Sequence, residues 1–211
     1  MFQALKNVSL QIPRGKVFGI IGSNGAGKST LLRAISGVLP PTSGEVRVNG
    51  EMDALIQLGA GFDAELNAVE NIYLNRSLHG MSNAEIKDRV PEILQFAELE
   101  DFADTPIKYY SSGMAARLGF AVAIDKNPDI LVVDEVLAVG DERFNEKCMS
   151  VFYSLLEQNK TIILVSHALG QVEQLCDSVA LIASGEVAFV GSAAEAIACY
   201  RDASYQTRLN E

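Results

Sequence analysis

The fold of this chain is decided by the stretch Gly22-Ser23-Asn24-Gly25-Ala26-Gly27-Lys28-Ser29-Thr30. This stretch fits the pattern G-x-x-x-x-G-K-[ST], which is typical of loops that bind phosphate. The apolar residues 17–21 come directly before it and predict a short buried strand, and residues 31–35 predict the first turns of a helix. A strand, a glycine-rich loop and a helix in this order let backbone N–H groups and the helix N-terminus surround an anion.

Two side chains in this loop have predicted roles of their own. Lys28 is expected to supply a mobile positive charge to the outer phosphates of a nucleotide, and the Ser29 hydroxyl is suited to ligate Mg²⁺. The alternative is a glycine-rich turn that matches the pattern by coincidence. The strand and helix that flank the loop argue against that alternative.

Length and composition limit the class of protein. The chain has 211 residues, which predicts one large α/β domain or one domain with an insertion, and 48% of them are apolar, enough for a sizeable core. The 27 acidic and 17 basic side chains give a net charge of −10. Because a nucleic-acid binder presents a basic face, this balance argues against a nucleic-acid partner and is simply expected to favour solubility.

Cysteines and apolar runs indicate the compartment. Cys148, Cys176 and Cys199 are far apart and form no C-x-x-C pair, so we expect buried small hydrophobes in a reducing compartment. No signal peptide is visible after Met1, and the longest apolar runs, such as 161–165, fall far short of the ~20 residues that span a membrane. The sequence therefore predicts a cytosolic or peripheral protein.

The N-terminal quarter predicts strands around the glycine-rich loop. Residues 4–12 alternate apolar and polar side chains, as a half-buried strand does. Residues 45–48 predict another strand, and Asn49-Gly50 predicts a hairpin turn into a partner strand over 51–58.

From about Gly59 to residue 126, the sequence predicts helices instead of strands. Gly59-Ala60-Gly61-Phe62 predicts a flexible joint, and three helices are expected after it, over 69–78, 82–97 and 112–125. The second begins with a capping box of Ser82 and Glu85, and Pro91 in its interior is expected to kink or split it. We interpret 59–126 as a helical insert in an α/β core.

The α/β pattern returns after the insert. Residues 129–134 form a continuous apolar run, as expected for the centre of a parallel sheet. Ser184-Gly185 predicts a hairpin turn. The remaining expected elements are strands over 161–165, 178–183 and 186–190 and helices over 141–158, 169–175 and 192–200.

Three side chains at strand ends are candidates for chemistry on a phosphate. Carboxyl ends of parallel strands face the ligand crevice, so Asp134 and Glu135 are expected beside the glycine-rich loop. Asp134 is suited to hold Mg²⁺, and Glu135 to polarise a water that attacks the γ-phosphate. His167, after the strand over 161–165, is expected to reach the same phosphate. The alternatives are a solvated acidic strand end and a structural histidine.

A second candidate anion site lies in the insert. Ser111, Ser112 and Gly113 begin the helix over 112–125 and offer hydroxyl and N–H groups to an anion. An ordinary helix cap is the alternative. This helix start does not easily fold onto the chain's own phosphate loop, which favours a homodimer with a nucleotide between the two copies.

Taken together, these motifs resemble those of the ABC ATPases, in family order over residues 4–200. The resembling motifs are Gly22–Thr30 (Walker A), Tyr110–Met114 (signature, with Ser112 and Met114 in place of Gly and Gln), Ile130–Glu135 (Walker B), Val139–Asp141 (D-loop) and Ser166-His167 (switch-histidine loop).

The resemblance implies one ABC ATPase domain over 1–211. Its expected fold is α/β: a RecA-like P-loop NTPase core with an N-terminal antiparallel β portion and the helical subdomain inserted at about 59–126. It implies ATP and Mg²⁺ as cofactors and Asp141 as a contact of the bound nucleotide. Gln57 is the best candidate for the glutamine that senses ATP and Mg²⁺. The family stacks an aromatic residue on adenine, for which Phe2 is a weak substitute.

A subfamily is indicated by three stretches, 58–62, 110–123 and 134–141, which look like those of ATPases that export polysaccharides. This resemblance implies an ATPase that powers export of O-antigen, capsule or teichoic-acid polymers. It also implies an integral-membrane permease as partner and a peripheral location on the cytoplasmic face of the bacterial inner membrane. The alternatives are another transporter class, a DNA- or ribosome-directed ATPase, and a nucleotide-controlled switch without hydrolysis.

Overall fold

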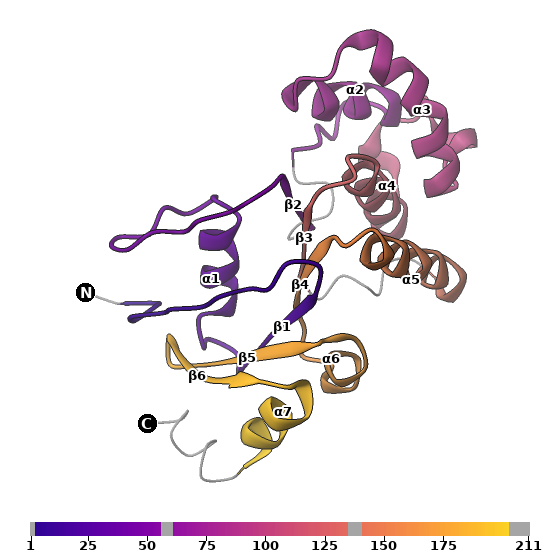
Figure 1. Ribbon diagram of the computed structural model, residues 1–211. Coiled ribbons are helices and arrows are strands. Elements are labelled where there is room, and N and C mark those ends of the chain that lie inside the picture. Colours follow the sequence, from indigo (N-terminus) through magenta and orange to yellow (C-terminus); the bar gives the residue numbers. More distant parts are fainter. Residues whose placement is uncertain (1–2, 56–60, 135–140, 203–211) are drawn as a thin grey trace. The chain divides into compact units, whose positions relative to one another are not determined.

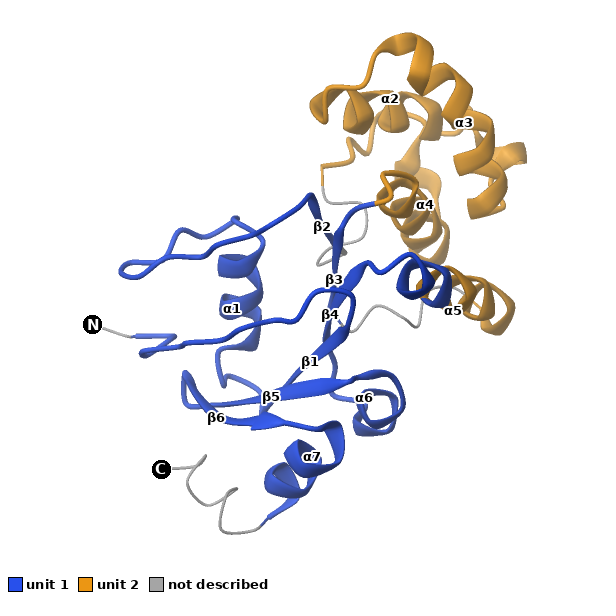
Figure 2. Ribbon diagram, in the orientation of Figure 1, with its two compact units in different colours: residues 1–54, 128–135, 153–211 blue, residues 55–127, 136–152 orange. Residues whose placement is uncertain are grey.

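The computed structural model describes residues 3–55, 61–134 and 141–202 of the chain. The chain divides into two compact units (Figure 2). The first, which we call the sheet unit, comprises residues 1–54, 128–135 and 153–211. The second, which we call the helical unit, comprises residues 55–127 and 136–152. It therefore covers most of the expected insert and also the residues around the start of a later helix.

The sheet unit is built on a six-stranded sheet of order β2-β3-β4-β1-β5-β6 (Figure 1). The pairs β1–β4, β1–β5 and β3–β4 are parallel, and only the β5–β6 pair is antiparallel among the pairs that the structure describes. The α/β class that the sequence predicts is confirmed. The strands are β1 Val17–Ile21, β2 Met52–Leu55, β3 Ile130–Asp134, β4 Thr161–Val165, β5 Ser178–Ala183 and β6 Glu186–Gly191.

The central strands are buried on both faces, which explains their unbroken apolar runs. All five residues of β1 and of β4 are buried. Helices α1 (Lys28–Ile35) and α6 (Leu169–Leu175) lie on opposite sides of these strands (Figure 1). Helix α7 (Ala193–Arg201) packs against β5, β6 and α6. The predicted hairpin between β5 and β6 turns through Ser184 and Gly185, which have φ of 48° and 82°, as a primed turn requires.

Two predicted strands are wrong. Residues 4–12 and 45–48 have no strand assignment, although burial does alternate along 6–12. Residues 37–51 are exposed throughout, so their alternating side chains have no layer to pack on. Beyond them, the Glu51 carbonyl accepts hydrogen bonds from the N–H groups of Asp129 and Ile130 (2.9 and 3.0 Å), and β2 then lies beside β3 instead of forming a hairpin with 45–48.

Helices dominate the second unit. They are α2 (Ala68–Leu78), α3 (Asn83–Ala97), α4 (Ser112–Asp125) and the start of α5 (Glu142–Glu157), with short 3₁₀ turns η1 (Glu100–Phe102) and η2 (Ile107–Tyr109). Ser82 caps α3 in a capping box with Glu85, as predicted. Helix α3 continues through Pro91, so the predicted split does not occur.

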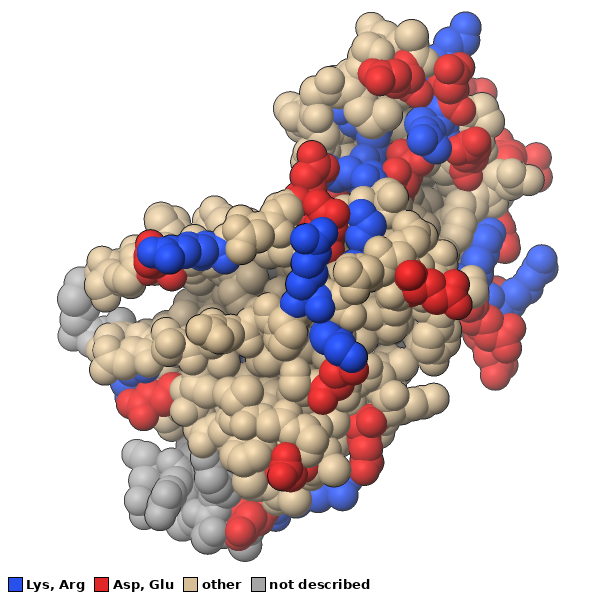
Figure 3. Space-filling model, in the orientation of Figure 1, with Lys and Arg blue, Asp and Glu red and all other residues tan. Residues whose placement is uncertain are grey.

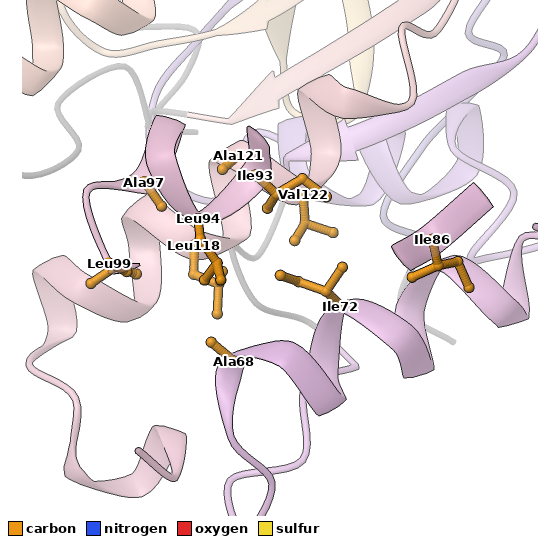
Figure 4. Close-up of a cluster of buried hydrophobic side chains, with 10 residues drawn as sticks. All are labelled: Ala68, Ile72, Ile86, Ile93, Leu94, Ala97, Leu99, Leu118, Ala121 and Val122. Carbon is orange, nitrogen blue, oxygen red and sulfur yellow. The ribbon is translucent and has the colours of Figure 1, made fainter. Parts of the chain in front are cut away.

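A single apolar cluster joins α2, α3 and α4 (Figure 4). Ile72 of α2, Ile93 of α3 and Leu118 of α4 are each at most 2% exposed. Burial of such side chains stabilises by roughly 1.5–3 kcal/mol apiece, which offsets the entropy of ordering the helices. Over this unit, charged side chains of both signs are interspersed on the face shown in Figure 3.

Within the part of the chain that the structure describes, each helix is too short or too polar to traverse a lipid bilayer.

Candidate functional site

The glycine-rich loop connects β1 to α1, as the sequence predicts. Gly27 is the residue that caps α1, with φ of 107°, and a Cβ there would lie 2.8 Å from the Ala4 carbonyl oxygen. At Gly22 a Cβ would lie 2.3 Å from the carbonyl oxygen of Ile182 in β5. Glycine at these two positions is therefore a steric requirement of the loop. The loop also joins the β5–β6 turn, where Gly185 N–H donates to the Ala26 carbonyl (2.9 Å).

Lys28 is a buried residue. The residue is only 6% exposed, and its Nζ donates to the carbonyl oxygens of Gly22 (2.9 Å) and Ser23 (2.8 Å). These bonds hold the ammonium group inside the curve of the loop, where a phosphate would meet it. The expected role of Lys28 toward the outer phosphates stays a prediction. Ser29, the next residue, is exposed in the first turn of α1.

The parallel register brings the candidate carboxylate to the edge of the sheet where the loop begins. Val165, the last residue of β4, pairs with Asp134 of β3 on one side and with Ile20 of β1 on the other. Two strand spacings separate Asp134 from Ile20, about 10 Å. Ile20 lies two residues before Gly22. Hydroxyl and carboxylate oxygens of Ser29 and Asp134 are the donor type that Mg²⁺ prefers.

His167 follows β4 at this same edge. It is exposed, whereas the preceding Ser166 is 4% exposed and its hydroxyl accepts a hydrogen bond from Ala168 N–H (3.0 Å). This local bond turns the chain sharply after the strand, so that His167 emerges at the carboxyl end of the sheet. The adjoining candidate Glu135 lies outside the described residues, as does Gln57.

The second candidate anion site is the start of α4 in the helical unit. Ser111 caps the helix, its hydroxyl accepting from Met114 N–H (3.1 Å). Ser111 and Ser112 are exposed, and a Cβ on Gly113 would meet nothing nearer than 3.8 Å. Met114 is partly buried and packs against the apolar cluster of the unit. Of the two positions that depart from the family signature, Met114 thus contacts the core and Ser112 is exposed.

Asp141 has two structural partners that the sequence did not indicate. Its carboxylate accepts from Phe144 N–H (2.9 Å) at the start of α5 and pairs with the Arg117 guanidinium of α4 (3.0 Å). The hydrogen bond from Phe144 and the charge of Arg117 lower the pKa of this carboxyl below its usual value. Asp141 thereby joins the signature helix to the first turn of α5. Its expected contact with a nucleotide stays a prediction.

Arg117 is the residue that sequence reasoning missed. It also pairs with Glu98 (3.2 Å) at the end of α3, and its guanidinium carbon lies 4.9 Å from the centre of the Phe144 ring. That ring belongs to a cluster of three aromatic side chains, with Phe96 and Phe120. A signal was available, because Arg117 is the only charged residue in the apolar stretch 114–124.

Two of the three cysteines, Cys148 and Cys176, are buried. Burial raises the pKa of Cys148 and of Cys176 to about 12, so both thiols stay protonated at neutral pH. They are the small buried hydrophobes that the sequence predicts, whereas Cys199 is only partly buried, so the prediction is wrong for that residue.

The sheet unit therefore gathers Gly22–Thr30, Asp134 and His167 at one edge of one sheet. The helical unit separately holds Ser111–Gly113 and Asp141. Among known proteins, the family model described as ABC transporter matches residues 5–138. The chain belongs to the ABC transporter family.

Several relatives of the chain are named as ATP-binding proteins of export systems. It is 49% identical over 203 residues to "O-antigen export system ATP-binding protein RfbB" of Myxococcus xanthus, covering 96% of this chain and 46% of that protein. It is 48% identical to "Teichoic acids export ATP-binding protein TagH" of Listeria monocytogenes, covering 92% and 58%. An RfbB of Klebsiella pneumoniae is 43% identical, covering 96% and 82%. The chain thus spans about half the length of the first two.

Solved structures agree on the fold. A dimeric ATP-binding cassette, MJ0796, in a post-hydrolysis state bound to ADP and Pi, superposes with a TM-score of 0.77 at 29% identity, covering 90% of each chain. An ATP-binding subunit of an ABC transporter gives a TM-score of 0.82 at 24% identity, covering 99% of this chain and 93% of that one. The predicted P-loop NTPase fold of an ABC ATPase is confirmed.

Proposed function

We propose that this chain is the ATP-hydrolysing subunit of an exporter that moves a lipid-linked polysaccharide across the bacterial inner membrane. The observation that carries the proposal is the gathering of the phosphate loop, Asp134 and His167 at one edge of the sheet. The names of the exporter relatives support a polysaccharide as the transported substrate. In this proposal the substrate is O-antigen, capsule or teichoic-acid polymer.

Each group at the sheet edge has a chemical task in this proposal. The N–H groups of Gly22–Thr30 surround the β- and γ-phosphates, and the Lys28 ammonium neutralises charge that grows on the transferring phosphoryl group. Ser29 and Asp134 would hold Mg²⁺, which neutralises phosphate charge when bound. Glu135 orients and polarises the attacking water, and His167 donates a hydrogen bond to the γ-phosphate.

A second copy completes the site in the same proposal. Ser111, Ser112 and Gly113 of one copy cover the γ-phosphate held by the other, so ATP closes a homodimer and hydrolysis reopens it. Gln57 senses Mg²⁺, and Asp141 supports the closed interface. An integral-membrane permease receives the motion at the cytoplasmic face of the inner membrane, where the subunit is peripheral.

The decisive variant is Glu135→Gln, which keeps the size of the side chain and removes the carboxylate that polarises water. We expect ATP binding to persist, phosphate release to fall by about 100-fold or more, and an ATP-dependent dimer to accumulate in gel filtration. The matched control is Glu157→Gln, an exposed carboxylate at the end of α5, which should hydrolyse ATP like the unmodified chain. Unchanged phosphate release in Glu135→Gln contradicts the assigned role.

The transported polymer needs a separate experiment in cells. A strain that carries Glu135→Gln as its sole copy should lose surface polysaccharide and retain the polymer inside the cell, whereas Glu157→Gln should display it normally. Normal display by the Glu135→Gln strain would contradict polysaccharide export even if hydrolysis is abolished in vitro.

A further inference from the structure

A fully buried asparagine lies in the helical unit, outside the motifs considered so far. Asn71, in the first turns of α2, is 0% exposed. Its Oδ1 accepts from Asp63 N–H (2.7 Å), and its Nδ2 lies 2.9, 3.1 and 2.9 Å from the carbonyl oxygens of Asp63, Leu66 and Asn67. The whole amide is therefore bonded to the turn that precedes α2. This turn begins directly after Gly61 and Phe62 of the predicted joint.

These bonds are not required to begin the helix. Asn67 and Glu70 already form a capping box at the start of α2, with both reciprocal hydrogen bonds at 2.9 Å. A helix start that is capped in this way needs no buried amide one turn later. Burying an amide is costly unless it is fully bonded, so Asn71 needs another explanation. We find it in what the turn 63–67 holds.

The turn 63–67 supports the segment that leads into the signature. Ile107 N–H donates to the Leu66 carbonyl and Lys108 N–H to the Ala64 carbonyl, both at 3.0 Å. An ion pair joins Lys108 to Glu65. We call residues 63–67 and 106–110 together the strap. The Leu66 carbonyl oxygen is the shared acceptor of the strap, because both the Ile107 N–H and the Asn71 amide donate to it.

The strap ends at the signature itself. Tyr110 N–H donates to the Ile107 carbonyl (2.8 Å), and the Tyr110 hydroxyl donates to the Phe102 carbonyl (2.7 Å). Ser111 follows at once and caps α4. A continuous series of hydrogen bonds thus runs from the Asn71 amide through Leu66 and Ile107 to the residue before Ser111.

We propose that Asn71 is a positioning residue for the signature: by fixing the turn 63–67, it sets the position from which Ser111–Gly113 meets the phosphate bound by a second copy. This inference rests on the shared ATP site of the proposed function. Asn71 itself touches no nucleotide. Its effect is therefore exerted on the partner's site and not on the phosphate loop of its own chain.

The test uses that difference between the two sites in mixed dimers of the full chain. Lys28→Ala removes the phosphate loop of one copy, and Asn71→Ala loosens the signature of the other. Each variant by itself should release phosphate about tenfold or more slowly than the unmodified chain. In an equimolar mixture, the working loop of the Asn71→Ala copy faces an intact signature, so phosphate release should rise well above the sum of the two.

The matched control combines the same two substitutions in one copy. A double variant, Lys28→Ala with Asn71→Ala, is mixed with Asn71→Ala, so the one working loop faces a loosened signature and no recovery is expected. Gly113→Asp mixed with Lys28→Ala tests the shared site directly. Recovery there without recovery for Asn71→Ala overturns the positioning role. Failure of both mixtures overturns the shared site and the positioning role with it.

Amide hydrogen exchange separates positioning from loss of fold. In Asn71→Ala, the amides of Ile107 and Lys108 should exchange about tenfold faster, whereas those of residues 86–97 in α3 should keep their protection. In Asn71→Ser, which keeps one donor in a shorter side chain, the exchange rates of Ile107 and Lys108 should lie between those of the unmodified chain and those of Asn71→Ala. Unchanged exchange at Ile107 and Lys108 in both variants contradicts the proposal, as does equal loss of protection in α3.

Discussion

The two units hold their functional groups by different means. In the sheet unit, neighbouring parallel strands end in register, so backbone pairing itself brings Asp134 and the phosphate loop to one edge. In the helical unit, side chains hold the signature: Asn71 through the strap, and Arg117 through Asp141. Backbone-built sites are sensitive to added bulk at glycine, whereas side-chain-built sites are sensitive to the loss of single polar groups.

The largest effect that this comparison predicts is on the phosphate loop. A Cβ at Gly22 would lie 2.3 Å from the Ile182 carbonyl oxygen, so Gly22→Ala should lower the free energy of unfolding by about 3 kcal/mol or more. Gly25→Ala is the control, because a Cβ there meets nothing within 4 Å. Its φ of 79° is unfavourable for alanine, so the expected loss in unfolding free energy is about 1 kcal/mol. Urea unfolding followed by circular dichroism measures both; equal losses would contradict the steric explanation.

The next effect should be a gain in the helical unit. Pro91 is exposed in the interior of α3, where it lacks an N–H for the helix. Pro91→Ala should therefore raise the free energy of unfolding by about 1–2 kcal/mol. Lys87→Ala, one turn earlier on the same helix and also exposed, should change it little. A destabilised Pro91→Ala would mean that the proline ring packs usefully, and thermal unfolding decides this.

A similar or smaller loss is expected when a polar link in the helical unit is cut. Arg117→Met keeps much of the apolar stem but removes the pairs with Asp141 and Glu98, and should cost about 1–2 kcal/mol. Arg117→Lys should recover part of this, since a charge remains but the planar fork does not. If both variants melt like the unmodified chain, the link between α4 and α5 contributes nothing to stability.

The smallest predicted effect is a pH dependence. A hydrogen bond from Phe144 N–H and the charge of Arg117 lower the pKa of Asp141, so this carboxylate stabilises the fold fully above its unfolded pKa of about 3.9. That contribution is lost as the pH falls through the lower folded-state pKa. The difference in unfolding free energy between the unmodified chain and Asp141→Asn should stay constant above about pH 5 and shrink in acid. A difference that grows in acid would contradict this sign.

Much of the fold was predictable because its signals are local. The phosphate loop, the buried strands and the capping box of Ser82 and Glu85 each depend on a few adjacent residues. The strands predicted over 4–12 and 45–48 were wrong because alternation shows only that one face is apolar. Whether such a segment pairs depends on a distant partner, and Glu51 bonds to Asp129 and Ile130 instead.

The candidate site divides in the same way. Asp134 and His167 were predictable, since the rule that parallel strands end at one edge converts sequence order into proximity. The contacts of Arg117 and Asn71 were not predictable. Arg117 pairs with Asp141, 24 residues later, and Asn71 bonds to Asp63, 8 residues earlier, and no local sequence pattern specifies either partner. Pro91 does not split α3 for a related reason: a packed helix tolerates a proline that an isolated helix would not.

By itself, the sequence predicted a strand, a glycine-rich loop of phosphate-binding type and a helix in this order, because the residues that build this unit are adjacent in the chain. The tertiary structure decided the rest. It showed Lys28 bonded inside the loop, Asp141 paired with Arg117, and Asn71 bonded to the turn before α2. Such contacts depend on which elements meet, and that is settled by packing of the whole chain rather than by any one segment.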